Sequence, residues 1–243
     1  MKTRIVLLSL IALVSILTSC NKNKYEIIPS KNVTSIEKSV AIENRIDITG
    51  PFQVYLTFSD TEESIIVEAN ENLHTYIDIE NKNGWLKINT QKYINITNSD
   101  RVMNIYITTK NINEYQLEGA SSISLENELY ADNLSIELSG ASNFTGNIYT
   151  KSLYATLLGA SKIDVSGNTE LLDINAEGAC SVKNFHLETT QLEAKLNGGS
   201  EVYSSVSESL KVRAHGGSNV YYKGNGVIQS QDLSGGSSIK KMD

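Results

Sequence analysis

The sequence predicts an all-β protein, a right-handed parallel β-helix in which a single chain winds in coils of about 19 residues. A glycine followed by a small residue and then serine or cysteine recurs seven times, with spacings of 21, 19, 19, 20, 18 and 19 residues. Apolar and polar residues alternate on both sides of each glycine, and no segment sustains a period of 3.6 residues. The glycines that begin these turns are Gly119, Gly140, Gly159, Gly178, Gly198, Gly216 and Gly235.

Each repeat reads as a strand, a glycine turn and a second strand. The residues two before and four after each turn glycine are apolar throughout, as Leu138 and Phe144 are around Gly140. A unit this short buries too few side chains to fold alone, so neighbouring repeats must share backbone ladders and a core. Same-sense strands then lie parallel, about 4.8 Å apart, and right-handed coiling is the default for such connections. Glycine supplies the turn dihedrals, and larger neighbours would collide with their copies in the next coil.

The domain organisation follows from where this pattern begins. We expect one solenoid domain over residues 36–243, in which 111–243 form the seven coils. Residues 36–110 also alternate, but less regularly, and are predicted to be strands throughout.

The first residues read as a targeting segment and lie outside the fold. An apolar run of 13 residues, Ile5 to Leu17, is too short to span a bilayer, so residues 1–19 are predicted to be a signal peptide. The string Leu17-Thr18-Ser19-Cys20 resembles a bacterial lipobox, whose cysteine is acylated after cleavage. We therefore expect a lipid on Cys20 and a tether over 20–35, so that the protein is anchored to a membrane and does not span it. An ordinary signal peptide that ends near a chance cysteine is the alternative.

Charge and cysteine content argue against nucleic-acid binding and against a disulfide. The formal net charge is −7, and without Lys2 and Arg4 there remain 19 basic and 28 acidic side chains, which argues against nucleic acid. If Cys20 is lipidated, Cys180 is the remaining cysteine, so no disulfide is expected, and it reads as a small residue in a serine position. Neither a cofactor nor a metal is expected, because no compact cluster of ligands is visible. The basic residues after Cys20 favour a periplasm-facing outer-membrane protein, with surface exposure left open.

Two carboxylates are predicted to lie side by side. Asp173 and Glu193 both stand five residues before their turn glycines, in adjacent coils, and should point outward. Glycoside hydrolases use such pairs. Lys211 takes the next rung, and Lys195 and Arg213 lie on the same face, which is typical of a solvated, charge-compensated ladder. No catalytic residue is therefore expected.

Two tyrosines form the other candidate ligand surface. Tyr203 and Tyr221 both stand five residues after their glycines, so they should stack on the outer face, whereas Tyr222 should point inward. Exposed rings suit a sugar or a protein partner. A stabilising aromatic ladder between strands is the alternative.

The sequence resembles the putative auto-transporter adhesin, head GIN domain family, secreted or lipid-anchored proteins common in Bacteroidetes-type bacteria. The resemblance rests on the repeated Gly-Ala-Ser, as in Ile136–Ser142, and on the stretches Ile46–Leu56 and Val67–Leu73. It implies a right-handed parallel β-helix, an adhesin-like role and no catalytic residues. No autotransporter anchor is expected in this sequence, so the resemblance does not extend to the route of secretion.

These observations together predict a lipid-anchored module of the cell envelope that binds a glycan or another envelope protein. A polysaccharide-degrading β-helix enzyme, lyase or hydrolase, is the competing hypothesis. A structural spacer or an envelope-stress sensor is a third. The last coil, which ends at Lys240 and Lys241, should present an open edge, so a homo-oligomer also stays open.

Overall fold

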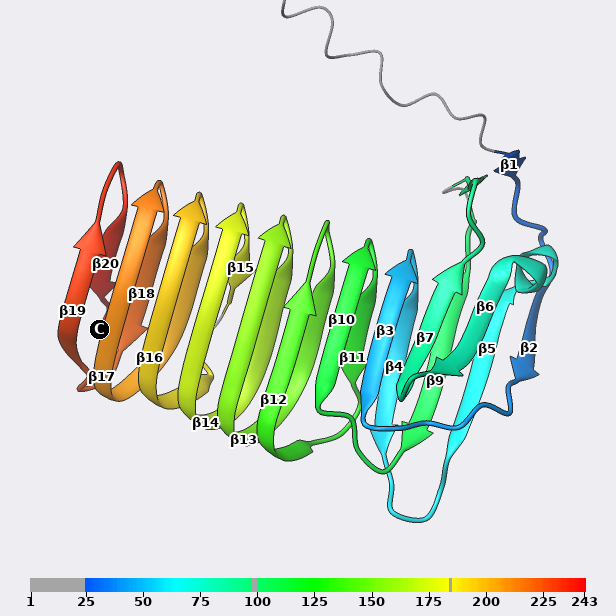
Figure 1. Cartoon of the computed structure of the whole chain (residues 1–243), viewed down its shortest axis with the longest axis horizontal. Helices are drawn as coiled ribbons and strands as arrows, with labels where there is room; N and C mark the ends of the chain where they lie inside the picture. The colour runs from blue at the N-terminus through cyan, green and yellow to red at the C-terminus, as the bar shows by residue number, and fades with distance from the viewer. Residues whose placement is uncertain (1–24, 98–99, 184) are drawn as a thin grey trace, which may run out of the picture.

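The structure, a computed structural model, describes residues 25–97, 100–183 and 185–243. It is a β-solenoid of about seven turns, with two layers of strands facing each other along one long axis (Figure 1). The predicted all-β solenoid is therefore confirmed, and the hand of its coil stays a prediction. The signal peptide and Cys20 lie outside the described residues.

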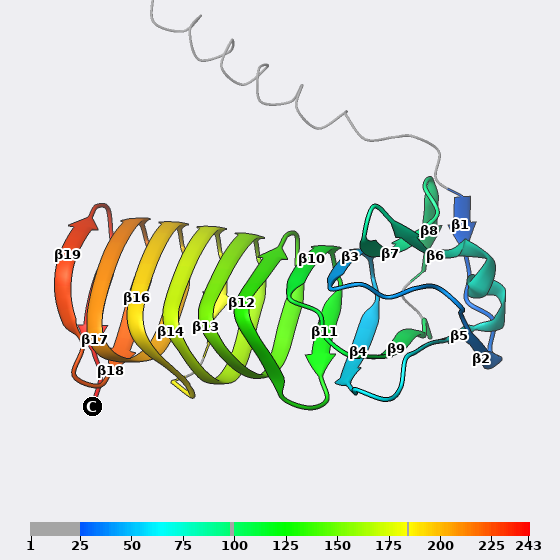
Figure 2. The ribbon, with the colours of Figure 1, turned by 60° about the horizontal axis from the view of Figure 1, so that its bottom comes forward.

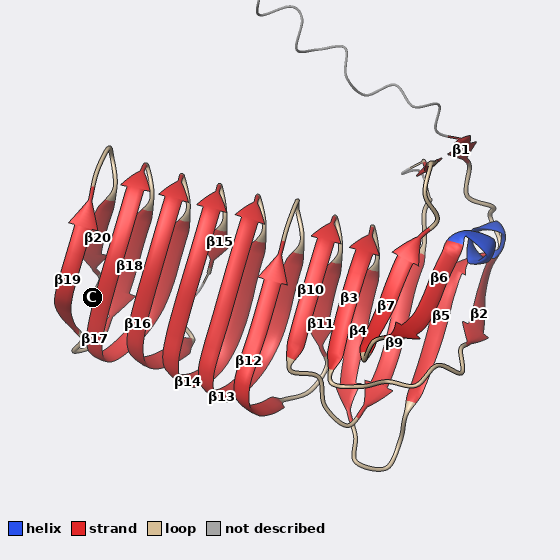
Figure 3. Ribbon diagram, in the orientation of Figure 1, coloured by secondary structure: helices blue, strands red, loops and turns tan. Residues whose placement is uncertain are grey.

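The regular coils repeat one path around the core. The chain climbs one layer, reverses at a tight glycine turn, descends the other layer and passes through a wide bend (Figure 3). Every strand in these coils pairs in parallel with its copy in the next coil. The strands are β10 (Glu114–Gly119), β11 (Ser122–Leu125), β12 (Leu129–Leu138), β13 (Asn143–Gly159), β14 (Lys162–Gly178), β15 (Ser181–Val182), β16 (Leu187–Gly198), β17 (Glu201–Gly216), β18 (Asn219–Lys223), β19 (Val227–Leu233) and β20 (Ser238–Lys241).

The tight turns stack so closely that only glycine fits their first position. Gly159 has φ +80°, and a Cβ added there would lie 2.7 Å from the carbonyl oxygen of Gly140 in the coil before. The N–H of Ala160 donates to that same carbonyl at 2.7 Å. Ser161, fully buried, donates its hydroxyl to the carbonyl of Leu158 at 2.9 Å. The predicted glycine and serine ladders are thus structural parts of the turn.

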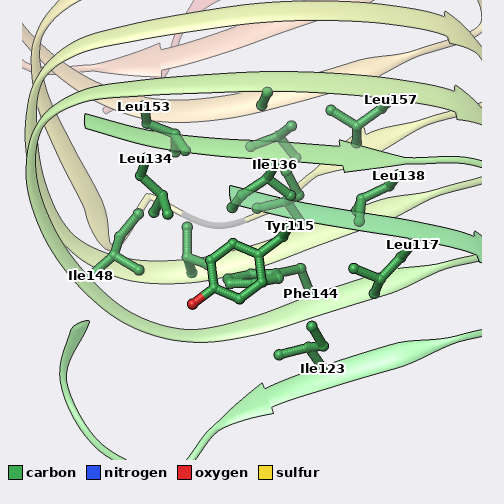
Figure 4. Close-up of a cluster of buried hydrophobic side chains, with 14 of the residues drawn as sticks. Tyr115, Leu117, Ile123, Leu134, Ile136, Leu138, Phe144, Ile148, Leu153 and Leu157 are labelled. Carbon is green, nitrogen blue, oxygen red and sulfur yellow. The ribbon is translucent and has the colours of Figure 1, made fainter. Parts of the chain in front are cut away.

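The inward rows fill the space between the layers with apolar side chains (Figure 4). Tyr115 is the largest of the fully buried side chains and packs edge-on against Phe144, with ring centroids 4.9 Å apart. Its hydroxyl donates to the carbonyl of Ile112 at 2.8 Å, so the one polar atom of the ring has a partner. Burial raises the pKa of Tyr115 well above its ordinary value.

The regular coils begin before residue 111, which is where the sequence pattern placed the first of them. Strands β3 (Arg45–Gly50) and β4 (Gln53–Phe58) form a coil in parallel register with β10 and β11, and Gly50 aligns with Gly119. Strands β7 (Trp85–Thr90) and β9 (Met103–Thr109) pair with β3 and β4 on the side away from β10 and β11. The order in space therefore differs from the order in sequence, because the chain returns past β3 and β4 to begin β10 (Figure 1).

Antiparallel strands and one short helix close this end of the core. Strands β2 (Val33–Glu37) and β5 (Ser64–Asn70) pair antiparallel, as do β6 (Ile77–Lys82) and β7. The prediction of strands throughout 36–110 was wrong at η1, a 3₁₀ helix over Glu71–Tyr76. The chain reverses there between β5 and β6, and only Leu73 of this segment is buried.

Part of the predicted tether is paired. Strand β1 (Tyr25–Ile27) runs parallel to β8 (Ile94–Ile96), and β2 begins at Val33, within the range 20–35 that the sequence assigned to the tether. Alternation is weak in these short strands, which is why the sequence did not reveal them.

The coil at the other end is incompletely covered. In β19 and β20 the residues that continue the inward rows are only partly buried, and Leu233 keeps 36% of its surface exposed. Gln231, where the apolar pattern fails, is also exposed.

Candidate functional site

The predicted charge ladder lies on the layer that precedes the glycine turns. Asp173 and Glu193 are register partners in β14 and β16, and Glu193 is in turn the register partner of Lys211. The Lys211 ammonium lies 2.9 Å from a Glu193 carboxylate oxygen. Arg213, the register partner of Lys195, lies 3.4 Å from Asp232. The sequence therefore placed these side chains in the correct rows.

This ladder offers little room for a ligand. The hollow above Glu193, Lys195, Lys211 and Arg213 has a volume of about 270 Å³. Both charges of the Lys211–Glu193 pair are engaged with each other. Asp173 has one carboxylate oxygen that is buried and accepts no hydrogen bond among the described residues. The residues that line the hollow include Glu193 but not Asp173.

The predicted tyrosine pair forms, but its ring faces are covered. Tyr203 and Tyr221 stack with centroids 4.6 Å apart and planes at 17°. Phe185 packs edge-on against Tyr203 at 5.5 Å, and the Lys240 ammonium lies 5.7 Å from the Tyr221 ring centroid. Tyr222 points inward as expected, with 7% of its surface exposed. The pair is therefore an internally satisfied stack with exposed edges.

A larger hollow, which the sequence analysis missed, follows the wide bends. It is a groove of about 790 Å³. The wide bends that line it lie along the lower edge of the ribbon in Figure 1, and Figure 2 turns this edge toward the viewer. Three consecutive positions in each of five coils and two in a sixth line it, so it runs five steps of about 4.8 Å, or about 24 Å, along the solenoid. We call it the bend groove; its residues are Tyr130–Asp132, Tyr149–Lys151, Asn168–Glu170, Glu188–Thr190, Ser205–Ser207, Gly224 and Asn225.

In four of the five coils that contribute three residues, the middle residue is buried beneath the groove, and three of these four are threonines that hold the bend in shape. Thr150, Thr169 and Thr189 are register partners and buried. Each threonine hydroxyl lies 2.8–3.1 Å from the carbonyl oxygen two residues further along the chain and donates to it. These hydroxyls are therefore taken up by the backbone, and a ligand would meet the side chains on either side of them.

One wall of the bend groove ends in an open aromatic surface. Tyr130 and Tyr149 stack with centroids 5.0 Å apart and planes at 12°. Tyr130 keeps 64% of its surface exposed, and no further ring contact or cation lies on it within the described part of the chain. Its hydroxyl donates to Glu128 at 2.5 Å, which raises the pKa of Tyr130 and holds the ring in place. Unlike the Tyr203–Tyr221 pair, this pair presents a ring face to solvent.

The charges of the bend groove are few and lean acidic. The Lys151 ammonium lies 2.8 Å from Asp132, whose carboxylate raises the pKa of Lys151. Glu170 and Glu188 add two carboxylates, so three acidic groups face one basic group. The remaining lining side chains are mostly uncharged hydroxyls and amides. Such a surface suits an uncharged polar chain and repels polyanions.

The bend groove had a signal in the sequence. Tyr130 and Tyr149 are separated by 19 residues, as are Thr150 and Thr169, which is the period of the coil. Counted from the turn glycine that follows, Tyr130 and Tyr149 both stand ten residues before it, and Thr150, Thr169 and Thr189 stand nine before it. This phase changes only in the next coil. The ladder shifts register between Thr189 and Gln191.

Metal and membrane features are limited. No group of three or more His, Cys, Asp or Glu side chains that could hold a metal ion occurs over residues 25–97, 100–183 and 185–243. Within the same residues, no helix has the length and apolar character needed to cross a bilayer.

Solved structures share this fold. A putative adhesin from Bacteroides fragilis is 24% identical, with a TM-score of 0.83 over 89% of this chain and 100% of that one. A putative lipid binding protein from Parabacteroides distasonis is 19% identical, with a TM-score of 0.75 over 90% of this chain and 100% of that one. A putative adhesin from Parabacteroides merdae is 15% identical, with a TM-score of 0.70 over the same shares. At these identities the likeness shows the fold alone.

Family membership rests on the sequence itself. A search of curated proteins finds no match to this chain. The family described as putative auto-transporter adhesin, head GIN domain matches residues 44–226, three quarters of the chain and nearly all of the solenoid. The chain belongs to this family of putative auto-transporter adhesins with a head GIN domain.

Proposed function

We propose that this protein is a non-catalytic binding module of the cell envelope and that it holds a linear, uncharged glycan along the bend groove. The single observation that carries the proposal is the open ring face of Tyr130 at the end of a groove about 24 Å long. The adhesin description of the family supports a binding role.

The chemistry of the groove favours a sugar polymer over a protein segment. A sugar ring offers an apolar face of C–H groups to an aromatic ring and hydroxyls to polar side chains. The groove supplies both, with Tyr130 and Tyr149 at one end and Asn168, Thr190 and Ser207 along its walls. The edges of the sheet are already paired at each bend, so no strand can be added there.

The test is a binding screen with paired variants. Purified protein is titrated by calorimetry with neutral linear glucans and mannans, and the tightest probe is repeated with Tyr130→Ala/Tyr149→Ala. Covering roughly 50 Å² of ring at about 25 cal/mol per Å² is worth about 1.3 kcal/mol, so binding should weaken about tenfold. Tyr203→Ala/Tyr221→Ala is the matched control, because it removes an equally stacked pair outside the groove. Equal losses in the two variants, or no binding to any neutral glycan, would contradict the proposal.

Attachment to the membrane through Cys20 is part of the same proposal. The lipobox-like string Leu17-Thr18-Ser19-Cys20 supports it. An acylated protein facing the periplasm from the outer membrane would place the groove near envelope glycans. Cys20→Ala should move the protein from the membrane fraction to the soluble fraction and abolish labelling by a fatty-acid analogue. Unchanged partition would refute the anchor without touching the groove.

A catalytic function is the second candidate, because Asp173 and Glu193 are register partners. Turnover of a polysaccharide that is lost with Asp173→Asn or Glu193→Gln would favour it. Binding without turnover would favour the module. If the protein is a spacer or a stress sensor, it should bind no soluble glycan. If its ligand is an envelope protein, it should bind that protein and no glycan.

A further inference from the structure

A second surface on the solenoid has the opposite charge to the bend groove. It surrounds the stack of Tyr203 and Tyr221 on the layer that follows the glycine turns. The Lys223 ammonium lies 5.0 Å from the Phe185 ring centroid, and the Lys240 ammonium lies 5.7 Å from that of Tyr221. We call these five residues the aromatic–lysine patch.

The two lysines of the patch lie against aromatic rings and not against carboxylates. No carboxylate lies within 4.0 Å of Lys223 or Lys240 over residues 25–97, 100–183 and 185–243. Glu201, two residues before Tyr203, is engaged with the hydroxyl of Tyr203 at 3.4 Å. Ion pairs are made instead by Lys87, Lys110, Lys151, Lys211 and Arg213. In a chain with a net charge of −7, the patch therefore presents two positive charges that form no ion pair with a described residue.

The rings hold the two ammonium groups in place. Contact with an aromatic face restricts the long lysine stems, so less conformational entropy is lost when an anion binds. Tyr221 and Lys240 are register partners in β18 and β20, and Lys223 lies two residues beyond Tyr221 on the same face. The two lysines are thus diagonal neighbours, with Cα atoms about 8 Å apart. Their ammonium groups lie against rings of different coils, Phe185 and Tyr221, so they suit two acidic groups on one polymer better than a single small anion.

We propose that the aromatic–lysine patch binds the acidic groups of a polysaccharide, such as the carboxylates of a polyuronate. The carboxylates of the bend groove repel such a polymer, so the two surfaces would take glycans of different charge. They adjoin at Ser205, which lines the groove and donates its hydroxyl to the carbonyl of Phe185 at 2.7 Å. The patch does not depend on the groove being occupied.

The test compares two variants with the same change in net charge. Polygalacturonate is titrated at low and at high salt into the protein, into Lys223→Gln/Lys240→Gln and into Lys110→Gln/Lys211→Gln, whose lysines are paired with Asp60 and Glu193. The patch variant should bind roughly tenfold more weakly at low salt, because two exposed charge contacts are lost. The control should stay within about twofold, and salt should weaken binding to the wild type.

Several outcomes would overturn the inference. Equal losses of affinity in the two variants would mean that only net charge matters. If the wild type does not bind polygalacturonate, the patch is not a polyuronate site. Binding to phosphatidylglycerol vesicles through the same lysines, without binding to the polyuronate, would make the patch a membrane contact. Binding of a neutral glycan should be unchanged in the patch variant. The test of the patch and the test of the groove are therefore independent, and either proposal can fail while the other holds.

Discussion

Replacing Gly198 with alanine should destabilise the protein far more than the same replacement at its neighbour Gly199. Gly198 has φ +92°, and an added Cβ would lie 2.6 Å from the carbonyl oxygen of Gly178. The left-handed conformation costs a non-glycine residue about 1–2 kcal/mol. Relieving the contact also disturbs the hydrogen bond from the Gly199 N–H to that carbonyl, 2.8 Å long, which is worth about 0.5–1.5 kcal/mol. The expected loss is about 1.5–3.5 kcal/mol.

Alanine at Gly199 should not destabilise the protein. A Cβ there meets no atom within 4 Å, and its φ lies outside the left-handed region. Four other coils already carry alanine at this position, namely Ala120, Ala141, Ala160 and Ala179. Alanine should therefore be neutral or stabilise by about 0.4–1 kcal/mol through the unfolded chain.

Urea unfolding followed by circular dichroism measures both effects. With a slope of about 2–3 kcal/mol per M, the midpoint should fall by about 1 M for Gly198→Ala and stay level or rise for Gly199→Ala. Equal shifts in the two variants would refute the claim that stacking of the coils requires glycine at the first turn position.

Three further predictions follow from the core and the surface. Leu157→Ala, at a fully buried position between two coils, should cost about 2–5 kcal/mol of unfolding free energy, and a loss below 1 kcal/mol would mean that the rows do not pack as described. Cys180→Ser should be neutral or stabilising in thermal unfolding, because the cysteine sulfur lies 3.5 Å from the Glu177 carbonyl where serine in other coils donates at 2.8–2.9 Å; a large destabilisation would contradict the equivalence. Burial raises the pKa of the Cys180 thiol, so at pH 8 its thiolate fraction is low and alkylation by iodoacetamide should be slow until the protein unfolds, whereas rapid labelling of the folded protein would show that the thiol is accessible.

Much of the solenoid could be predicted from the sequence because each coil repeats the same constraint. Only glycine tolerates the contact between stacked turns, so the glycines mark the period and phase of every coil after residue 111. The alternation around them then sorts inward from outward residues, and the buried Val202 beside the half-exposed Tyr203 shows that this sorting holds. The adjacency of Asp173 and Glu193 follows from the same register.

The N-terminal coils were harder to predict because their turns depart from the repeat. Gly50 stands in the first turn position but is followed by Pro51, so the coil of β3 and β4 escaped the pattern. The return of the chain past this coil, and the helical reversal at Leu73, depend on contacts distant in sequence.

The candidate site was missed for a different physical reason. Tyr130, Tyr149, Asn168 and Glu188 form one row, ten residues before each turn glycine, but their side chains differ in chemistry. No repeated residue type therefore marks the groove in the sequence. The sequence also could not show that Phe185 and Lys240 cover the faces of the Tyr203–Tyr221 stack, because each comes from another coil.

Amide chemical-shift mapping with a bound neutral oligosaccharide tests the central claim most directly. The protein is titrated with the linear glucan or mannan that binds most tightly, and the shifted amides are placed on the structure. Shifts should gather along the bend groove, at Tyr130–Asp132, Tyr149–Lys151 and Asn168–Glu170. Shifts confined to Tyr203 and Tyr221, or to the hollow above Glu193 and Lys211, would contradict the assignment of the groove as the glycan site.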